Sequence, residues 1–169
     1  MFFLSHIWLI PLFPACGAAI MLFFGRKLQK QTVNAVCVGV VALAFLFSCV
    51  AFSQYLGYAH DSPGKPYQTV VYTWLGTDTG GMNFVKHDGT AAAFQADVGF
   101  LLDPLSGIWL LFVTGVGMLI HIYSTGYMAH EGGYYRFFGY LNLFMFSMLT
   151  LILANNYVLM FVGDRKSVV

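Results

Sequence analysis

The feature that most constrains this chain is a pair of long apolar runs separated by a short polar turn. The runs, Pro104 to Tyr123 and Phe137 to Ala154, contain no Asp, Glu, Lys or Arg. Because an α-helix rises about 1.5 Å per residue, each run is long enough to cross the roughly 30 Å core of a bilayer. The residues between them, Ser124 to Arg136, are too few for a folded domain. The pattern therefore predicts a helical hairpin in a membrane.

The composition points to the same class of protein. Hydrophobic residues make up 59% of the chain and charged residues 9%, whereas soluble domains carry about 25% charged residues. This composition excludes a soluble globule and a disordered or nucleic-acid-binding chain. The cysteines, Cys16, Cys37 and Cys49, all lie in apolar runs. Their spacing fits neither a zinc nor an iron–sulfur site, so we interpret them as buried small residues.

Two further apolar runs precede this hairpin. Phe2 to Phe24 and Val33 to Tyr55 are joined by a basic turn, Gly25 to Thr32. Pro11 and Pro14 each lack a backbone N–H, so the first helix should be kinked or should start late. A short connection makes the two helices antiparallel. We therefore expect a second transmembrane hairpin at the beginning of the chain.

The segment between the two hairpins has a different character. Gly57 to Leu102 is rich in Gly, Asp and Thr, and it is too long to be a structureless loop. Within it, Thr69 to Leu75 is β-branched and aromatic, and Phe94 to Phe100 alternates apolar and polar residues. Such runs, separated by turn residues, predict a small β-hairpin at the membrane surface.

Together these segments predict an all-α integral membrane protein with four transmembrane helices, a truncated fifth helix and a small extramembrane β-hairpin. The fifth apolar run, Tyr157 to Val162, stops abruptly at Asp164-Arg165-Lys166 and would reach only about 9 Å as a helix, far short of a span. The expected divisions are a first transmembrane hairpin, an extracytoplasmic loop, a second transmembrane hairpin, and a short fifth helix with an atypical tail: residues 1–56, 57–102, 103–156 and 157–169.

Loop charges predict the orientation. The turn Gly25 to Thr32 holds three Lys or Arg residues, and the turn Ser124 to Arg136 ends on an arginine. The loop Gly57 to Leu102 holds only two lysines among four Asp residues. The positive-inside rule then places both turns in the cytoplasm and the long loop outside. The N-terminus should therefore be extracytoplasmic.

Small and polar residues mark one face of the third predicted helix. Gly107, Thr114, Gly117, His121 and Ser124 fall within about 100° of a helical wheel. Such stripes let membrane helices approach closely. An ionisable group at membrane depth is also a functional candidate. His121 is therefore either a packing residue that bonds to a neighbouring helix or a member of a proton path.

Other candidates lie near the helix ends. Asp103 precedes Pro104 and should cap that helix, with ion handling as the alternative. Arg136 and Glu131 share one turn, where we expect structural pairing or lipid contact rather than a proton path. A second small and polar stripe should face the first one or a helix of another subunit: Gly139, Asn142, Ser147 and Thr150. Three tyrosines should form an interfacial belt: Tyr127, Tyr134 and Tyr135.

Several short motifs follow one another in a specific order. They are Asp103-Pro104-Leu105-Ser106, Thr114-Gly115-Val116-Gly117, His121-Ile122-Tyr123-Ser124, Tyr127-Met128, Tyr135-Arg136-Phe137-Phe138, Asn142-Leu143-Phe144 and Ala154-Asn155-Asn156. Over about 60 residues, Phe100 to Gly163, they resemble subunit L of NADH:quinone oxidoreductase, respiratory complex I. The rest of the chain is compatible with this family.

The resemblance implies an antiporter-like membrane subunit of an enzyme that couples electron transfer from NADH to quinone with proton pumping. Such subunits hold no cofactor or metal of their own. NADH, FMN, the iron–sulfur clusters and quinone belong to the whole complex. The implied partners are other membrane subunits and the lipid bilayer, with no nucleic acid. The implied location is the bacterial inner membrane, and the chain is an enzyme subunit by membership, without catalytic residues of its own.

The end of the chain departs from the family pattern. After Gly163 the family continues with Trp and then Glu, where this chain has Asp164 and Arg165. We expect an N-terminal fragment of a truncated gene, with an unrelated tail. Two alternatives remain: the large subunit of a multisubunit cation/proton antiporter, and a non-pumping structural membrane protein. The segments His121-Ile122-Tyr123-Ser124 and Arg136-Phe137-Phe138 favour complex I.

Overall fold

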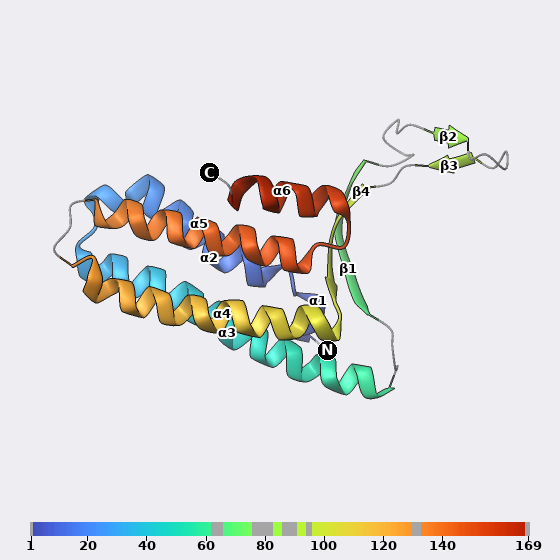
Figure 1. Ribbon diagram of the computed structural model, residues 1–169, viewed down its shortest axis with the longest axis horizontal. Helices are drawn as coiled ribbons and strands as arrows, with labels where there is room; N and C mark the ends of the chain where they lie inside the picture. Colours follow the sequence, from blue (N-terminus) through green and yellow to red (C-terminus); the bar gives the residue numbers. More distant parts are fainter. Residues whose placement is uncertain are drawn as a thin grey trace.

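The fold is a bundle of long helices with a small sheet at one end (Figure 1). The computed structural model describes residues 2–61, 66–75, 83–85, 91–93, 96–129 and 133–167. Within these ranges, 4 helices are long and apolar enough to cross a membrane, by length and composition. This number confirms the predicted four spans of an integral membrane protein.

The first span begins later than its apolar run. A single turn, α1 (Phe2–Ser5), is followed by α2 (Leu9–Phe24). Tight turns join them, with the Leu9 amide donating to the His6 carbonyl at 3.0 Å. Starting at Leu9 places Pro11 in the first turn, where its missing N–H costs no intrahelical bond. The predicted late start is confirmed, and Pro14 is accommodated inside the helix.

The second span is longer than predicted. A short 3₁₀ turn, η1 (Gly25–Lys27), leads into α3 (Lys30–Asp61), which has 32 residues. At about 1.5 Å per residue the helix measures about 48 Å, so it extends well beyond a bilayer core. The helix continues past Tyr55, where the predicted span ends, because no proline interrupts the sequence until Pro63.

The long loop contains the predicted hairpin. β1 (Tyr67–Leu75) pairs antiparallel with β4 (Ala96–Leu102), and the register runs from Tyr67 opposite Leu102 to Leu75 opposite Ala96. A second pair, β2 (Asn83–Val85) and β3 (Ala91–Ala93), lies between them in sequence and was not predicted. The hairpin of β1 and β4 stands across one end of the helix bundle (Figure 1).

The second helical hairpin starts with a capped helix. α4 (Pro104–Tyr127) is preceded by Asp103, whose carboxylate accepts a hydrogen bond from the Ser106 amide at 2.6 Å. The predicted capping role of Asp103 is therefore confirmed. α5 (Tyr134–Leu153) begins after Gly133, whose φ of 84° lies in the left-handed region that glycine adopts at no steric cost.

The last helix, α6 (Tyr157–Ser167), is longer than its apolar run. The side chain of Asn156 accepts a hydrogen bond from the Leu159 amide at 2.9 Å and caps the first turn. The helix continues beyond Asp164, where the apolar run stops. Neither a proline nor a further glycine follows Gly163, so nothing in the sequence breaks the helix there.

Helix α6 packs closely on α5. The two meet at Gly163, where an added Cβ would lie 3.2 Å from the Leu151 amide nitrogen and 3.2 Å from the Ser147 carbonyl oxygen. This backbone-to-backbone approach needs a residue without a side chain. The glycine therefore sets the distance between α5 and α6.

The four long helices form a ring. α2 packs against α3 and α5, and α4 packs against the same two helices. One buried cluster lies towards the sheet and includes Leu102 and Leu153. A second consists of Met21, Val33, Cys37, Tyr134 and Phe138.

The cysteines do not share one environment. Cys37 is buried, but Cys16 is exposed and Cys49 is half-buried. The prediction that all three are buried is wrong, because an apolar run that crosses a membrane does not tell which of its faces meets protein and which meets lipid.

Candidate functional site

Helix α4 buries one polar face. Its buried residues are Gly107, Leu110, Thr114, Gly117, His121 and Ser124. The predicted stripe contains five of these six, so helical periodicity alone identified the buried face. An added Cβ at Gly107 would lie 2.5 Å from the Phe52 ring of α3, and one at Gly117 would lie 2.5 Å from Met145 of α5. The stripe therefore packs between α3 and α5.

His121 lies on this face in the last third of α4 and is completely buried. Its Nδ1 is 2.7 Å from the Gly117 carbonyl oxygen, one turn earlier on the same helix. The expectation of a bond to a neighbouring helix is thus wrong. Across the helix interface, the imidazole lies 6.2 Å from the Phe138 ring of α5, measured between ring centroids. The neighbour contributes an apolar surface and not a hydrogen bond.

The bond to Gly117 fixes the tautomer of His121. A carbonyl oxygen only accepts hydrogen bonds, so Nδ1 carries the proton and donates it. In the neutral ring, Nε2 is then an acceptor, and it has no partner in the part of the chain that the structure describes. A buried acceptor without a partner is costly. Chemically, this nitrogen is able to take up a proton, which is the property that a relay group needs.

Asn142 is the second polar group inside the bundle. Its Nδ2 donates to the Phe138 carbonyl at 3.0 Å. Its Oδ1 has no hydrogen-bond donor among the described residues. An added Cβ at Gly17 of α2 would lie 3.0 Å from this oxygen, and Cys37 of α3 lies beside the amide. The amide therefore occupies the junction of α2, α3 and α5.

The predicted partner of the α5 stripe was wrong in part. Gly139 and Asn142 face α2, since an added Cβ at Gly139 would lie 3.3 Å from Met21 Cβ. Further along α5, Ser147 faces α6 through its carbonyl group. The part of the stripe that holds Gly139 and Asn142 therefore packs on α2, which contacts α5 more extensively than α4 does.

Several buried Ser and Thr hydroxyl groups bond to their own helices. Thr114 donates to the Leu110 carbonyl at 2.7 Å, and Thr150 donates to the Phe146 carbonyl at 2.8 Å. Ser48 of α3 bonds in the same way. Such bonds satisfy polar groups at membrane depth without linking helices. These residues fit packing positions, whereas His121 and Asn142 each keep an unpaired acceptor.

The four predicted site residues are not brought together. Asp103 lies at the sheet end of α4, and Arg136 is exposed at the opposite end of the bundle (Figure 1). The length of α4, 24 residues, separates these ends by about 36 Å. Glu131 lies outside the described residues. His121 is therefore the one member of the set that the described structure places inside the bundle.

A polar cluster at the turn end was missed by sequence reasoning. The Tyr134 hydroxyl donates to Asn34 Oδ1 on α3, and Lys30 Nζ donates to the Ala129 carbonyl at 2.7 Å. Tyr134 is only 5% exposed. It is therefore not part of an interfacial belt, whereas Tyr127 is exposed. The signal that was available is Asn34, a polar residue in the first turns of an apolar span.

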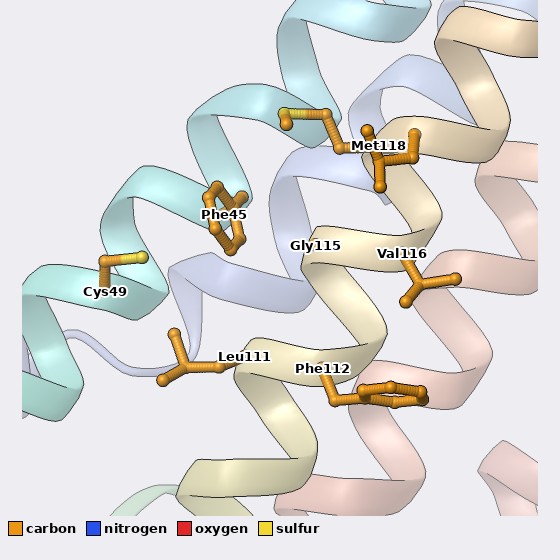
Figure 2. A pocket seen from close by; sticks show the side chains of 8 residues that line it. Phe45, Cys49, Leu111, Phe112, Gly115, Val116 and Met118 are labelled. Carbon is orange, nitrogen blue, oxygen red and sulfur yellow. The ribbon is translucent and has the colours of Figure 1, made fainter.

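The exposed side of α3 and α4 carries an apolar groove of about 600 Å³ (Figure 2). Its lining is apolar or sulfur-bearing: Phe45, Cys49, Leu111, Phe112, Gly115, Val116, Met118 and Leu119. Apart from the thiol of Cys49, no lining residue has a titratable side chain. Elsewhere in the described ranges, no three His, Cys, Asp or Glu side chains are gathered so that they could hold a metal ion.

A family model matches the part of the chain that contains most of these candidates. The model is described as NADH-Ubiquinone oxidoreductase (complex I), chain 5 N-terminus, and it matches residues 90–138. The matched range includes β4, all of α4 and the start of α5. Asp103, His121 and Arg136 all fall within it.

Curated relatives extend the similarity over most of the chain. NADH-quinone oxidoreductase subunit L of Mycobacterium tuberculosis is 39% identical over 158 residues, which cover 94% of this chain and 22% of the relative. The subunit L of Neisseria meningitidis is 38% identical and covers 92% of this chain and 20% of the relative. NAD(P)H-quinone oxidoreductase subunit 5 of Angiopteris evecta chloroplasts is 32% identical, and the matched region covers 94% of this chain and 19% of the relative. The chain thus spans about a fifth of the length of these relatives.

Proposed function

We propose that the chain belongs to the family of the subunit L and chain 5 proteins of NADH:quinone oxidoreductase, to which it is similar, and that it supplies the first transmembrane helices of a proton-translocating, antiporter-like subunit. The observation that carries the proposal is the similarity over 94% of the chain, including all four spans. The names of the relatives do not favour a cation/proton antiporter. In this function the chain takes part in coupling NADH-to-quinone electron transfer to proton pumping.

The main task of these helices is structural. The buried Thr and Ser groups of α4 and α5 bond back to their own helices, as packing residues do. His121 is the group with a second candidate role. Its buried, unpartnered Nε2 supports a place in a proton path. We assign packing as its first role and proton relay as the alternative.

The similarity to this family also supports a proposal for the partners, the cofactors and the membrane of the chain. The chain works as a subunit of the oxidoreductase and assembles with other membrane subunits of complex I. NADH, FMN, the iron–sulfur clusters and quinone are bound elsewhere in the complex. The membrane is the bacterial inner membrane. Residues 1–56 and 103–156 form the two transmembrane hairpins, residues 57–102 form the extracytoplasmic loop, and residues 157–169 form the last helix and tail.

A chimera tests the function. Residues 1–163 replace the corresponding helices in a bacterial subunit L, and inverted vesicles are assayed with a pH-sensitive dye after addition of NADH. We expect an assembled complex and NADH-driven proton uptake. The control carries an unrelated four-helix membrane segment of equal length. A chimera that inserts but does not assemble contradicts the proposal, and proton flux driven by Na⁺ or K⁺ without NADH would support the antiporter alternative.

Thiol labelling tests the orientation. In a background without Cys16, Cys37 and Cys49, Gly64→Cys should react with an impermeant reagent added outside the cell. Gln29→Cys, in the basic turn, should react only after the membrane is opened, because positive turns stay in the cytoplasm. The opposite labelling pattern contradicts an extracytoplasmic N-terminus.

A further inference from the structure

The turn between α2 and α3 and the start of α5 lie at the same end of the bundle, opposite the sheet (Figure 1), and both segments carry exposed cations. Arg26 and Lys27 form the last turn of η1, and both are exposed. Arg136, in the first turn of α5, is exposed as well. Neither Arg26 nor Lys27 has a hydrogen-bond or ion-pair partner in the described part of the chain. Three positive charges are therefore open to solvent or headgroups on one surface.

A direct contact holds the two segments together. Gly25 is buried against Tyr135, and an added Cβ would lie 2.8 Å from the tyrosine ring. Gly25 directly precedes Arg26, and Tyr135 directly precedes Arg136. The contact between Gly25 and Tyr135 therefore lies next to both Arg26 and Arg136, although these two cations are far apart in sequence.

The guanidinium of Arg136 is held in place. Its Nε donates to the Tyr135 hydroxyl at 3.1 Å, and its central carbon lies 5.7 Å from the centroid of that ring. A cation in the first turn of a helix is opposed by the helix dipole, so this charge does not stabilise α5. No described residue accepts a hydrogen bond from the other guanidinium N–H groups, so they are open to a ligand outside the described part of the chain.

Apolar and aromatic side chains lie next to these cations. Phe23 and Phe24, just before the basic turn, are 82% and 62% exposed, and Tyr140, one turn after Arg136, is 61% exposed. These residues belong to helices that are long and apolar enough to cross a membrane. A ligand that fits the surface therefore has an anionic head and an apolar body.

We propose that Arg26, Lys27 and Arg136 form a binding site for the headgroup of an anionic phospholipid, whose acyl chains lie along Phe23, Phe24 and Tyr140. Clusters of Lys and Arg at the end of a membrane helix attract anionic lipids, and Arg binds phosphate oxygens through paired N–H groups. Lys30 is not a member, since its ammonium is bonded to Ala129. The site depends on membrane insertion and not on the proposed role in complex I.

The test measures lipid retained by the full chain, purified in a nonionic detergent, by native mass spectrometry. The probes are phosphatidylglycerol, phosphatidylcholine and glycerol 3-phosphate. We expect phosphatidylglycerol to bind most tightly, and high salt to weaken it by screening. Each cation contributes about fivefold, so the triple variant Arg26→Gln, Lys27→Gln, Arg136→Gln should weaken binding by about a hundredfold at low salt.

Two control variants separate charge from other effects. Arg26→Lys with Arg136→Lys keeps the charges and should retain the preference for phosphatidylglycerol. Gln29→Ala changes an exposed, uncharged residue of the same turn and should have no effect. Circular dichroism of the triple variant checks that its helices are intact. The effect of salt on phosphatidylglycerol retention by the unmodified chain tests the contribution of charge without any substitution.

Four results would overturn the proposal. They are equal retention of the two lipids, an unchanged preference in the triple variant, retention that does not respond to salt, and displacement of the lipid by equimolar glycerol 3-phosphate. The last result would identify the ligand as a free phosphate compound. An acidic peptide serves as a further probe, and displacement of phosphatidylglycerol by this peptide would be a fifth overturning result, because it would identify the surface as a protein contact.

Discussion

The backbone amide of Asn155 donates a hydrogen bond to the carbonyl of Gly99 at 3.2 Å. This bond joins the turn between α5 and α6 to strand β4. The neighbouring pair, Phe100 and Ala154, forms an isolated β-bridge, and the Asn156 side chain donates to the Asp97 carbonyl. The sheet is therefore hydrogen-bonded directly to the turn between α5 and α6, in addition to its covalent connections to α3 and α4.

Gly99 is the residue that allows this attachment. An added Cβ at this position would overlap the side chain of Asn155. We expect Gly99→Val to lower the free energy of unfolding by about 1–3 kcal/mol, because the strand and the turn must move apart. The measurement is unfolding of the purified chain in detergent micelles, followed by circular dichroism.

The matched control for this prediction is Gly57→Ala in α3. An added Cβ at Gly57 meets no atom within 4 Å. Alanine also favours helix by about 1 kcal/mol over glycine. The control should therefore be neutral or stabilising. Equal stability of Gly99→Val and the unmodified chain would show that the contact of Gly99 with Asn155 does not constrain the fold.

Gly117 sets the approach of α4 to α5. The atoms nearest to an added Cβ are Met145 Cε at 2.5 Å and Sδ at 2.6 Å, the flexible end of a long side chain. We expect Gly117→Ala to be tolerated, because methionine can change rotamer. Gly117→Leu should destabilise the bundle by about 1–3 kcal/mol. Gly126→Leu, on the same helix with no atom within 4 Å, is the control. If Gly117→Leu and Gly126→Leu change stability equally, Gly117 does not set the approach of α4 to α5.

The buried hydroxyl of Tyr134 links α5 to α3. Tyr134→Phe removes the donor that satisfies Asn34 Oδ1 and also a 3.3 Å bond to the Thr125 carbonyl. Losing such a bond costs about 0.5–1.5 kcal/mol. Tyr127→Phe, at an exposed tyrosine of the neighbouring turn, should change stability by less than about 0.5 kcal/mol. If both variants unfold at the same denaturant concentration, the link does not stabilise the bundle.

His121 separates the two roles proposed for it. His121→Gln keeps an N–H group that can donate to the Gly117 carbonyl and removes the basic nitrogen. In an assembled complex we expect normal assembly and only a modest loss of NADH-driven proton uptake. Complete loss of proton uptake in a fully assembled complex would establish Nε2 as part of the path and contradict packing as the first role.

The properties that the sequence determined by itself are local ones. The four spans follow from the length of apolar runs. The cap at Asp103 follows from a carboxylate placed just before a proline. The buried face of α4, from Gly107 to Ser124, follows from the helical repeat. Each depends on residues within a few turns of one another, so the physical cause can be read along the chain.

Only the tertiary structure decided which surfaces meet. Tyr134 and Asn34 bond across 100 positions in sequence, and nothing local distinguishes Tyr134 from the exposed Tyr127. The face of α5 that holds Asn142 meets Gly17 of α2 and not the stripe of α4. Helix partners are selected by shape and by the satisfaction of polar groups across the whole bundle, because in lipid an apolar surface alone does not favour one neighbour over another.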